Sequence, residues 1–241
     1  MFPFLKKHNL LFLDHGLKGK LAREGLGLLF LKVVNISFTL TLSILLARIL
    51  GPDDFGVYAF TISLVMTLAI PIQIGFPQLI VRETSICQTH RNWSLVRGLW
   101  HWSTTVTFIY SVLIILIVIT ILIFQRNSIS GQRYITIFWA LPLIPIVTML
   151  NIRSASLRGL QRIVISQLPE SLLRPGLMII FVATMYIFRQ VMPITSKTIV
   201  TSHLCSSLCV LLFATLLLRR SLPIELKDCK SIKYQKKYWL N

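Results

Sequence analysis

The chain has 241 residues, of which 54% are hydrophobic and only 14% are charged, and its 25 basic residues far outnumber its 8 acidic ones. A soluble domain carries about 25% charged residues, so this composition excludes an ordinary soluble protein. A basic excess is also typical of nucleic-acid-binding proteins, but here the basic residues lie between long apolar runs, which argues against a nucleic-acid partner.

Residues 1–25 form a basic leader, which either lies on the membrane surface as a short helix or is a plain cytoplasmic segment. Six apolar runs follow, each near the ~20 residues that a helix needs to cross a membrane. They span residues 26–50, 55–79, 102–124, 134–152, 172–188 and 199–218, and a basic tail covers 219–241. The runs lack the alternation of barrel strands, so the predicted fold is all-α, a bundle of six transmembrane helices.

The first two runs are joined by the segment GPDDF, residues 51–55. It is predicted to form a five-residue turn, because Gly51 can adopt the left-handed conformation that ends a helix and Pro52 cannot continue its hydrogen bonds. Asp53 or Asp54 is expected to cap the second helix.

The basic residues predict the orientation of the bundle. Most of them, with Arg174 among them, fall before the first run or in the segments after the second, fourth and sixth runs. The opposite side has five: Arg48, Arg126, Arg133, Arg189 and Lys197. By the positive-inside rule, both termini are expected in the cytoplasm and GPDDF outside.

Catalytic, metal-binding and cofactor-binding patterns are not found in the sequence. Cys205 and Cys209 lie one helical turn apart in an apolar run and are expected to pack there. No paired carboxylates or Walker A loop occur, so we expect neither an enzyme nor a bound metal or cofactor. No acidic residue falls in the middle of a predicted run, so an ion-coupling carboxylate is not expected within the membrane.

Four polar residues in or beside the apolar runs are candidates for lining a substrate cavity. Lys32 and Asn35 share a helical face in the first run, and either they meet an anionic substrate such as a pyrophosphate or Lys32 extends to the membrane interface. Gln73 and Arg82 lie at the proline-rich inner end of the second run, where Gln73 either lines the cavity or bonds another helix. The basic segment 153–175 either lies on the inner membrane surface or extends a helix.

Two separate stretches carry a family resemblance. LARILGPDDFGVYAF with IGFPQLIVRE (46–60 and 74–83), and later SLRGLQRIVISQLPESLLRPGLMI (156–179), resemble the first hairpin and the loop after the fourth span of bacterial polysaccharide-biosynthesis flippases. These belong to the multidrug, oligosaccharidyl-lipid and polysaccharide exporter superfamily. The resemblance implies two six-helix lobes around a cavity with alternating access, of which this chain matches the N-terminal lobe.

The same resemblance implies a function and partners. The expected function is movement of undecaprenyl-pyrophosphate-linked oligosaccharide across the bacterial inner membrane, for assembly of surface polysaccharide such as lipopolysaccharide O-antigen. The expected partners are membrane lipid, that lipid-linked substrate, and a second lobe or a second copy of the chain. The sequence departs from the family in having neutral Gln73 where an acidic residue is common, and in having six runs where twelve are usual.

Two other functions remain open. A truncated, non-transporting remnant or scaffold of a polysaccharide assembly complex would explain the missing second lobe. A small-molecule cation exporter of the same superfamily would need acidic residues in the spans, which the sequence does not show.

Overall fold

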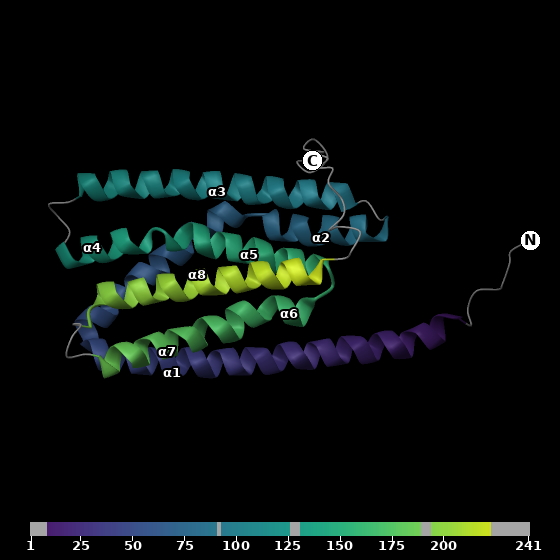
Figure 1. The fold of residues 1–241 in the computed structure, drawn as a ribbon, viewed down its shortest axis with the longest axis horizontal. Coiled ribbons are helices and arrows are strands. Elements are labelled where there is room, and N and C mark those ends of the chain that lie inside the picture. The colour runs from purple at the N-terminus through teal and green to yellow at the C-terminus, as the bar shows by residue number, and fades with distance from the viewer. Residues whose placement is uncertain (1–8, 91–92, 126–130, 189–193, 223–241) are drawn as a thin grey trace, which may run out of the picture.

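The computed structural model describes residues 9–90, 93–125, 131–188 and 194–222, and all elements of this part are helices (Figure 1). In chain order they are α1 (Asn9–Gln73), α2 (Phe76–Thr89), α3 (Trp93–Phe124), α4 (Gly131–Ala140), α5 (Leu143–Gly159), α6 (Ile163–Leu168), the π-helix η1 (Pro169–Leu173), α7 (Arg174–Ile187) and α8 (Ser196–Ser221).

The predicted basic tail, residues 219–241, is therefore described only as far as residue 222.

Five helical stretches in the described part are long and apolar enough to cross a membrane. The first, Glu24–Gln73, has 50 residues, about twice what one crossing needs, and it is broken at Gly51. The chain therefore folds back there, and α1 contributes two antiparallel spans (Figure 1). With α3, α4–α5, α6–α7 and α8, the chain is a multi-pass all-α membrane bundle, as predicted.

The turn between the first two spans is shorter than predicted. Only Gly51 leaves the helical conformation, with φ 74° and ψ 173°, a region that is almost restricted to glycine. The helix resumes at Pro52, because proline suits a first helical turn, where its missing N–H would have no partner in any case. The five-residue turn was thus a wrong prediction. Asp54 accepts hydrogen bonds from Gln132 and from Ser196, the latter at 3.4 Å, and so ties the hairpin to α4 and α8.

Glycine and proline also set the other breaks, which shift the predicted boundaries. The second span ends at Gln73, not at residue 79, because Gly75 has a φ of 80° and begins the separate helix α2. The fourth span is interrupted between α4 and α5, at Leu141 and Pro142. The first helix starts at Asn9 and continues without a break through the predicted leader boundary at residue 25.

The segment 153–175 extends helices and does not lie as one surface helix. Its first part completes α5, where Leu157 is fully buried, and the chain then turns at Gln161, which has a φ of 59°. Its second part forms α6, η1 and the start of α7, which together make one candidate span over Ile163–Ile187. Arg174 therefore lies inside a span, and assigning it to a cytoplasmic loop was wrong.

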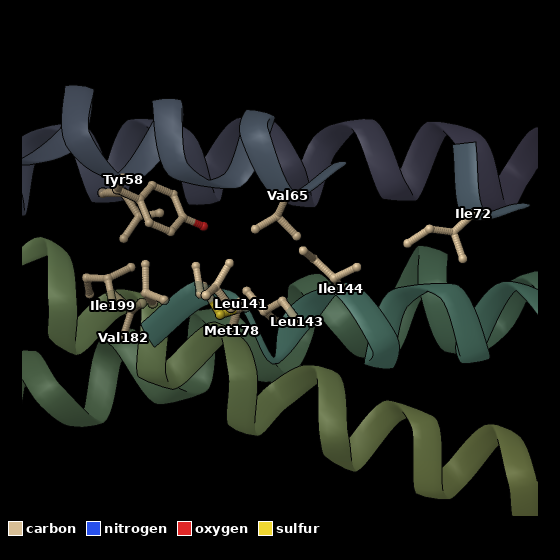
Figure 2. Packing of buried hydrophobic residues seen from close by; sticks show 12 residues of the cluster. Tyr58, Val65, Ile72, Leu141, Leu143, Ile144, Met178, Val182 and Ile199 are labelled. Atoms are coloured by element: carbon tan, nitrogen blue, oxygen red, sulfur yellow. The ribbon is translucent and has the colours of Figure 1, made fainter. Parts of the chain in front are cut away.

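The core lies between the second half of α1 and the helices α4, α5, α7 and α8 (Figure 2). Tyr58, Val65 and Ile72 of α1 point toward Ile144 of α5 and its neighbours. A second cluster, which includes Trp100, packs α2 and α3 against α5. The start of α1 and the end of α8 lie at the same end of the bundle, and the Gly51 turn lies at the other (Figure 1).

Candidate functional site

A cavity of about 450 Å³ lies between α1, η1, α7 and α8. It is lined by both halves of α1, before and after the break at Gly51. Apolar side chains make up half of its lining. The polar lining residues are Asn35, Thr39, Ser43, Tyr58, Ser63, Glu170, Arg174 and His203.

Three of these side chains form a hydrogen-bonded chain across three spans. The Arg174 Nη2 lies 2.8 Å from His203 Nε2, and His203 Nδ1 lies 3.0 Å from the Tyr58 hydroxyl oxygen. Because a guanidinium can only donate, Nε2 must accept and the ring proton must be on Nδ1. His203 is therefore a neutral imidazole that donates to Tyr58, and Tyr58 and His203 are both buried.

The π-helix explains how Arg174 comes to face the cavity. A π-turn widens the helix and shifts the direction of the residues that follow it, and such turns are frequent at functional sites. Here the N–H of Arg174 donates to the carbonyl of Pro169, five residues earlier. Glu170, four residues before Arg174, then lines the same cavity.

Asn35 holds this segment from the opposite side of the cavity. Pro175 has no N–H, so it cannot donate to the carbonyl of Ser171 four residues earlier, as an α-helix would require. The Asn35 Nδ2 donates to that carbonyl instead, at 3.0 Å. The contact fixes α1 to η1 next to Glu170 and Arg174.

Arg174 gives the cavity its capacity to bind an anion. Its Nε is buried and has no hydrogen-bond partner among the described residues. A cation inside a membrane span is costly and marks a functional site by default. Arginine also binds phosphate and carboxylate groups through two parallel N–H donors.

The structure separates the four candidates that the sequence suggested. Asn35 lines the cavity, whereas Lys32 is exposed and lines an adjoining cleft of about 420 Å³ that also includes Ser171. Gln73 accepts a hydrogen bond from Asn151 Nδ2 at 2.7 Å, which is the helix-to-helix alternative. Arg82 has a side chain that is 71% exposed, and its Nε lies 3.6 Å from Glu83. Neither Gln73 nor Arg82 is among the residues that line the cavity around Arg174.

Four residues that line the cavity were not predicted as site residues from the sequence: Tyr58, Glu170, Arg174 and His203. Arg174 and His203 could have been found, because each is an ionisable residue within a predicted run, 172–188 or 199–218. Glu170 precedes its predicted run by two residues, whereas the candidate span starts at Ile163, so this carboxylate lies inside a span, although near its start and not in its middle. Tyr58 carries no signal in the sequence that separates it from a core tyrosine.

Comparison with known proteins gives one match. A family model described as polysaccharide biosynthesis protein matches residues 21–237. The match includes all the residues that line the cavity. No curated protein and no solved structure matches the chain.

Proposed function

The chain belongs to the polysaccharide biosynthesis protein family, and we propose from this membership that its bundle is one lobe of a flippase in the bacterial inner membrane. Its substrate would be undecaprenyl-pyrophosphate-linked oligosaccharide, moved to the outer leaflet for assembly of surface polysaccharide. The observation that carries the proposal is Arg174, a cation in the middle of a span that lines a cavity large enough for a diphosphate.

The cavity suits the head group of such a lipid. Arg174 would offset the pyrophosphate charge, and the hydroxyl and amide groups of Asn35, Thr39 and Ser43 would bond its oxygens and the first sugar. These three residues follow one another at intervals of four along one face of α1. The polyprenyl tail would remain in the bilayer, against the exposed apolar residues of the same helix, which include Leu40 and Ile44.

Lys32 extends this face toward the cytoplasmic end of α1. It lines the adjoining cleft with Gln167 and Ser171, and Ser171 is also the residue whose carbonyl Asn35 binds. The two hollows therefore meet at the contact between Asn35 and Ser171. Lys32 would be the first cation that an entering pyrophosphate meets.

Complementation tests the proposal directly. In a strain that lacks its own flippase, the chain, expressed alone or with a second lobe, should restore surface polysaccharide. Arg174→Gln should abolish this restoration, because the head group loses its cation. Arg162→Gln is the matched control, because Arg162 is exposed at the turn before α6. Full restoration by Arg174→Gln, or none by the unmodified chain with its second lobe, would contradict the proposal, and the latter result would favour a non-transporting scaffold.

A small-molecule cation exporter is the second candidate, and Glu170 is the observation that favours it. This carboxylate lines the cavity within a candidate span, whereas the sequence alone placed it two residues before an apolar run. Arg174 lines the same cavity and opposes cation binding. Drug resistance that rises on expression and falls with Glu170→Gln would support the exporter over the flippase.

A further inference from the structure

We propose that binding of a phosphate-type anion at Arg174 is linked to uptake of one proton by His203, through the hydrogen bond that joins the two side chains. The inference rests on the anion site of the proposed function and adds its regulation by pH. It is carried by the chain from Arg174 through His203 to Tyr58.

The hydrogen bonds of His203 in this structure keep its ring neutral. Both ring nitrogens are occupied, since Nε2 accepts from Arg174 and the proton on Nδ1 is donated to Tyr58. A second proton on the ring would need Nε2, which lies 2.8 Å from a guanidinium nitrogen that has no acceptor capacity. Protonation would also place two positive charges side by side.

An anion in the cavity removes both obstacles to protonation of His203, the occupied Nε2 and the repulsion between two positive charges. A phosphate takes two parallel N–H groups of an arginine, and at Arg174 one of the candidate donors is the Nη2 that now serves His203. When the guanidinium turns to the anion, Nε2 loses its donor and its lone pair becomes free. One proton from the solution, delivered as hydronium, then binds Nε2, and the anion offsets the charge of both the imidazolium and the guanidinium. The N–H bond forms as one O–H bond of the hydronium breaks, and a water molecule is left.

The charged and titratable groups around His203 allow this step. Tyr58 faces it from α1, Arg174 from α7, and Glu170 of η1 lines the same cavity. The α5 sequence over 143–152 has no titratable residue, whereas α4 carries Arg133 and Tyr134 in its first turn. On α8 itself, Lys197 lies six residues earlier and packs over Trp139, 5.0 Å from the ring centroid. Among the described residues that line the cavity, Glu170 is thus the alternative proton acceptor.

The sign of the linkage follows from the proton count. The anion-bound state holds one more proton than the free state, so affinity for the anion should rise as the pH falls. For one linked proton the change is about tenfold per pH unit while His203 is neutral in the free protein.

Calorimetry of the full chain in lipid nanodiscs tests this, with inorganic pyrophosphate as the probe. Titrations in buffers of different ionisation enthalpy give the number of protons taken up. The wild type should take up about one proton more than His203→Gln, while His90→Gln, with its exposed histidine at the end of α2, should match the wild type. Protonation of pyrophosphate itself is common to all variants and cancels in the difference. Equal uptake by the wild type and His203→Gln, or loss of uptake in Glu170→Gln alone, would overturn the inference.

A second measurement leaves His203 in place. In a variant with the other four of the five histidines replaced by Gln, ¹⁵N NMR should show a neutral ring protonated on Nδ1 without pyrophosphate and an imidazolium with it. A ring that stays neutral with pyrophosphate bound would overturn the proposal.

Failure of pyrophosphate to bind would overturn both this inference and the anion site. Proton uptake without complementation would contradict the flippase function alone, and complementation without proton uptake would contradict the linkage alone.

Discussion

Asn35 and Pro175 show how single residues shape the cavity. Pro175 removes a backbone donor from the membrane interior, where an unpaired carbonyl cannot turn to water. Asn35 supplies the missing donor from another span, at 3.0 Å from the Ser171 oxygen. The two residues are 140 positions apart in the sequence, yet Asn35 donates to the carbonyl that Pro175 leaves without its usual backbone donor.

This dependence predicts a non-additive pair of substitutions. Asn35→Ala should lower the free energy of unfolding by about 1–3 kcal/mol, because it leaves the Ser171 carbonyl unpaired. In a Pro175→Ala background the new N–H can serve that carbonyl, so the cost of Asn35→Ala should fall by about 1 kcal/mol. Equilibrium unfolding in detergent measures both. Ser37→Ala is the control, since Ser37 is exposed and its hydroxyl donates within its own helix to Val33 O. Strictly additive costs would contradict the explanation.

At the level of single residues, the sequence can indicate only features that are local in the chain. Asn35 was recognised as a cavity candidate because it lies on a polar face of an apolar run. Gln73 looked equally suitable, but its partner Asn151 is on α5, and no spacing in the sequence shows that pairing. The Tyr58–His203 contact is hidden for the same reason, because the pairing is set by the packing of distant spans.

At the scale of elements, the crossing of α2 and α5 depends on one glycine. A Cβ added at Gly159 would lie 2.7 Å from Thr84 Cβ, closer than real side chains approach. Ser85 Oγ donates to the Gly159 carbonyl at 3.3 Å across this crossing, and Trp100 Nε1 of α3 donates to Thr84 Oγ1 at 3.1 Å. Small residues are a common means of close helix approach in membrane proteins.

Gly159→Ala should therefore destabilise the bundle by about 1–3 kcal/mol, because overpacking forces α2 and α5 apart. The shift in thermal unfolding temperature of the purified protein measures this effect. Gly176→Ala is the matched control, since a Cβ at Gly176 of α7 meets nothing within 4 Å. Thr84→Ser, which removes one contacting methyl group, should partly rescue Gly159→Ala. Equal effects of the two alanine variants would refute the close approach.

Glycine and proline made the number of spans predictable but not their ends. Gly51 and Pro52 marked the first turn, and the apolar runs gave six spans of roughly the right length. The helices nevertheless extend beyond the apolar runs, as α3 does by starting at Trp93 instead of residue 102. Hydropathy reports the part of a helix that lipid surrounds, whereas the hydrogen-bonded helix continues into the aqueous region. The same extension moved Glu170 from the edge of a predicted loop into a span.

For the whole molecule, the arrangement of the turns and the distribution of basic residues favour one orientation. The Gly51 turn lies at the end of the bundle opposite to α2 and to the start of α1 (Figure 1). The α2 end carries basic residues that the sequence assigns to the cytoplasmic side, among them Arg82, Arg97 and Arg219. The positive-inside rule then predicts that the α2 end is cytoplasmic and the Gly51 turn is outside.

Single-cysteine labelling in intact cells tests this orientation. In a variant that lacks the four native cysteines, Asp53→Cys at the Gly51 turn should react with a membrane-impermeant maleimide, because Asp53 is exposed and would face outward. His90→Cys, exposed at the end of α2, should react only after the cells are permeabilised. Reaction of both after permeabilisation is the control for thiol accessibility. The reverse pattern would place the α2 end outside the cell, and it would overturn both the predicted topology and the proposed direction of transport.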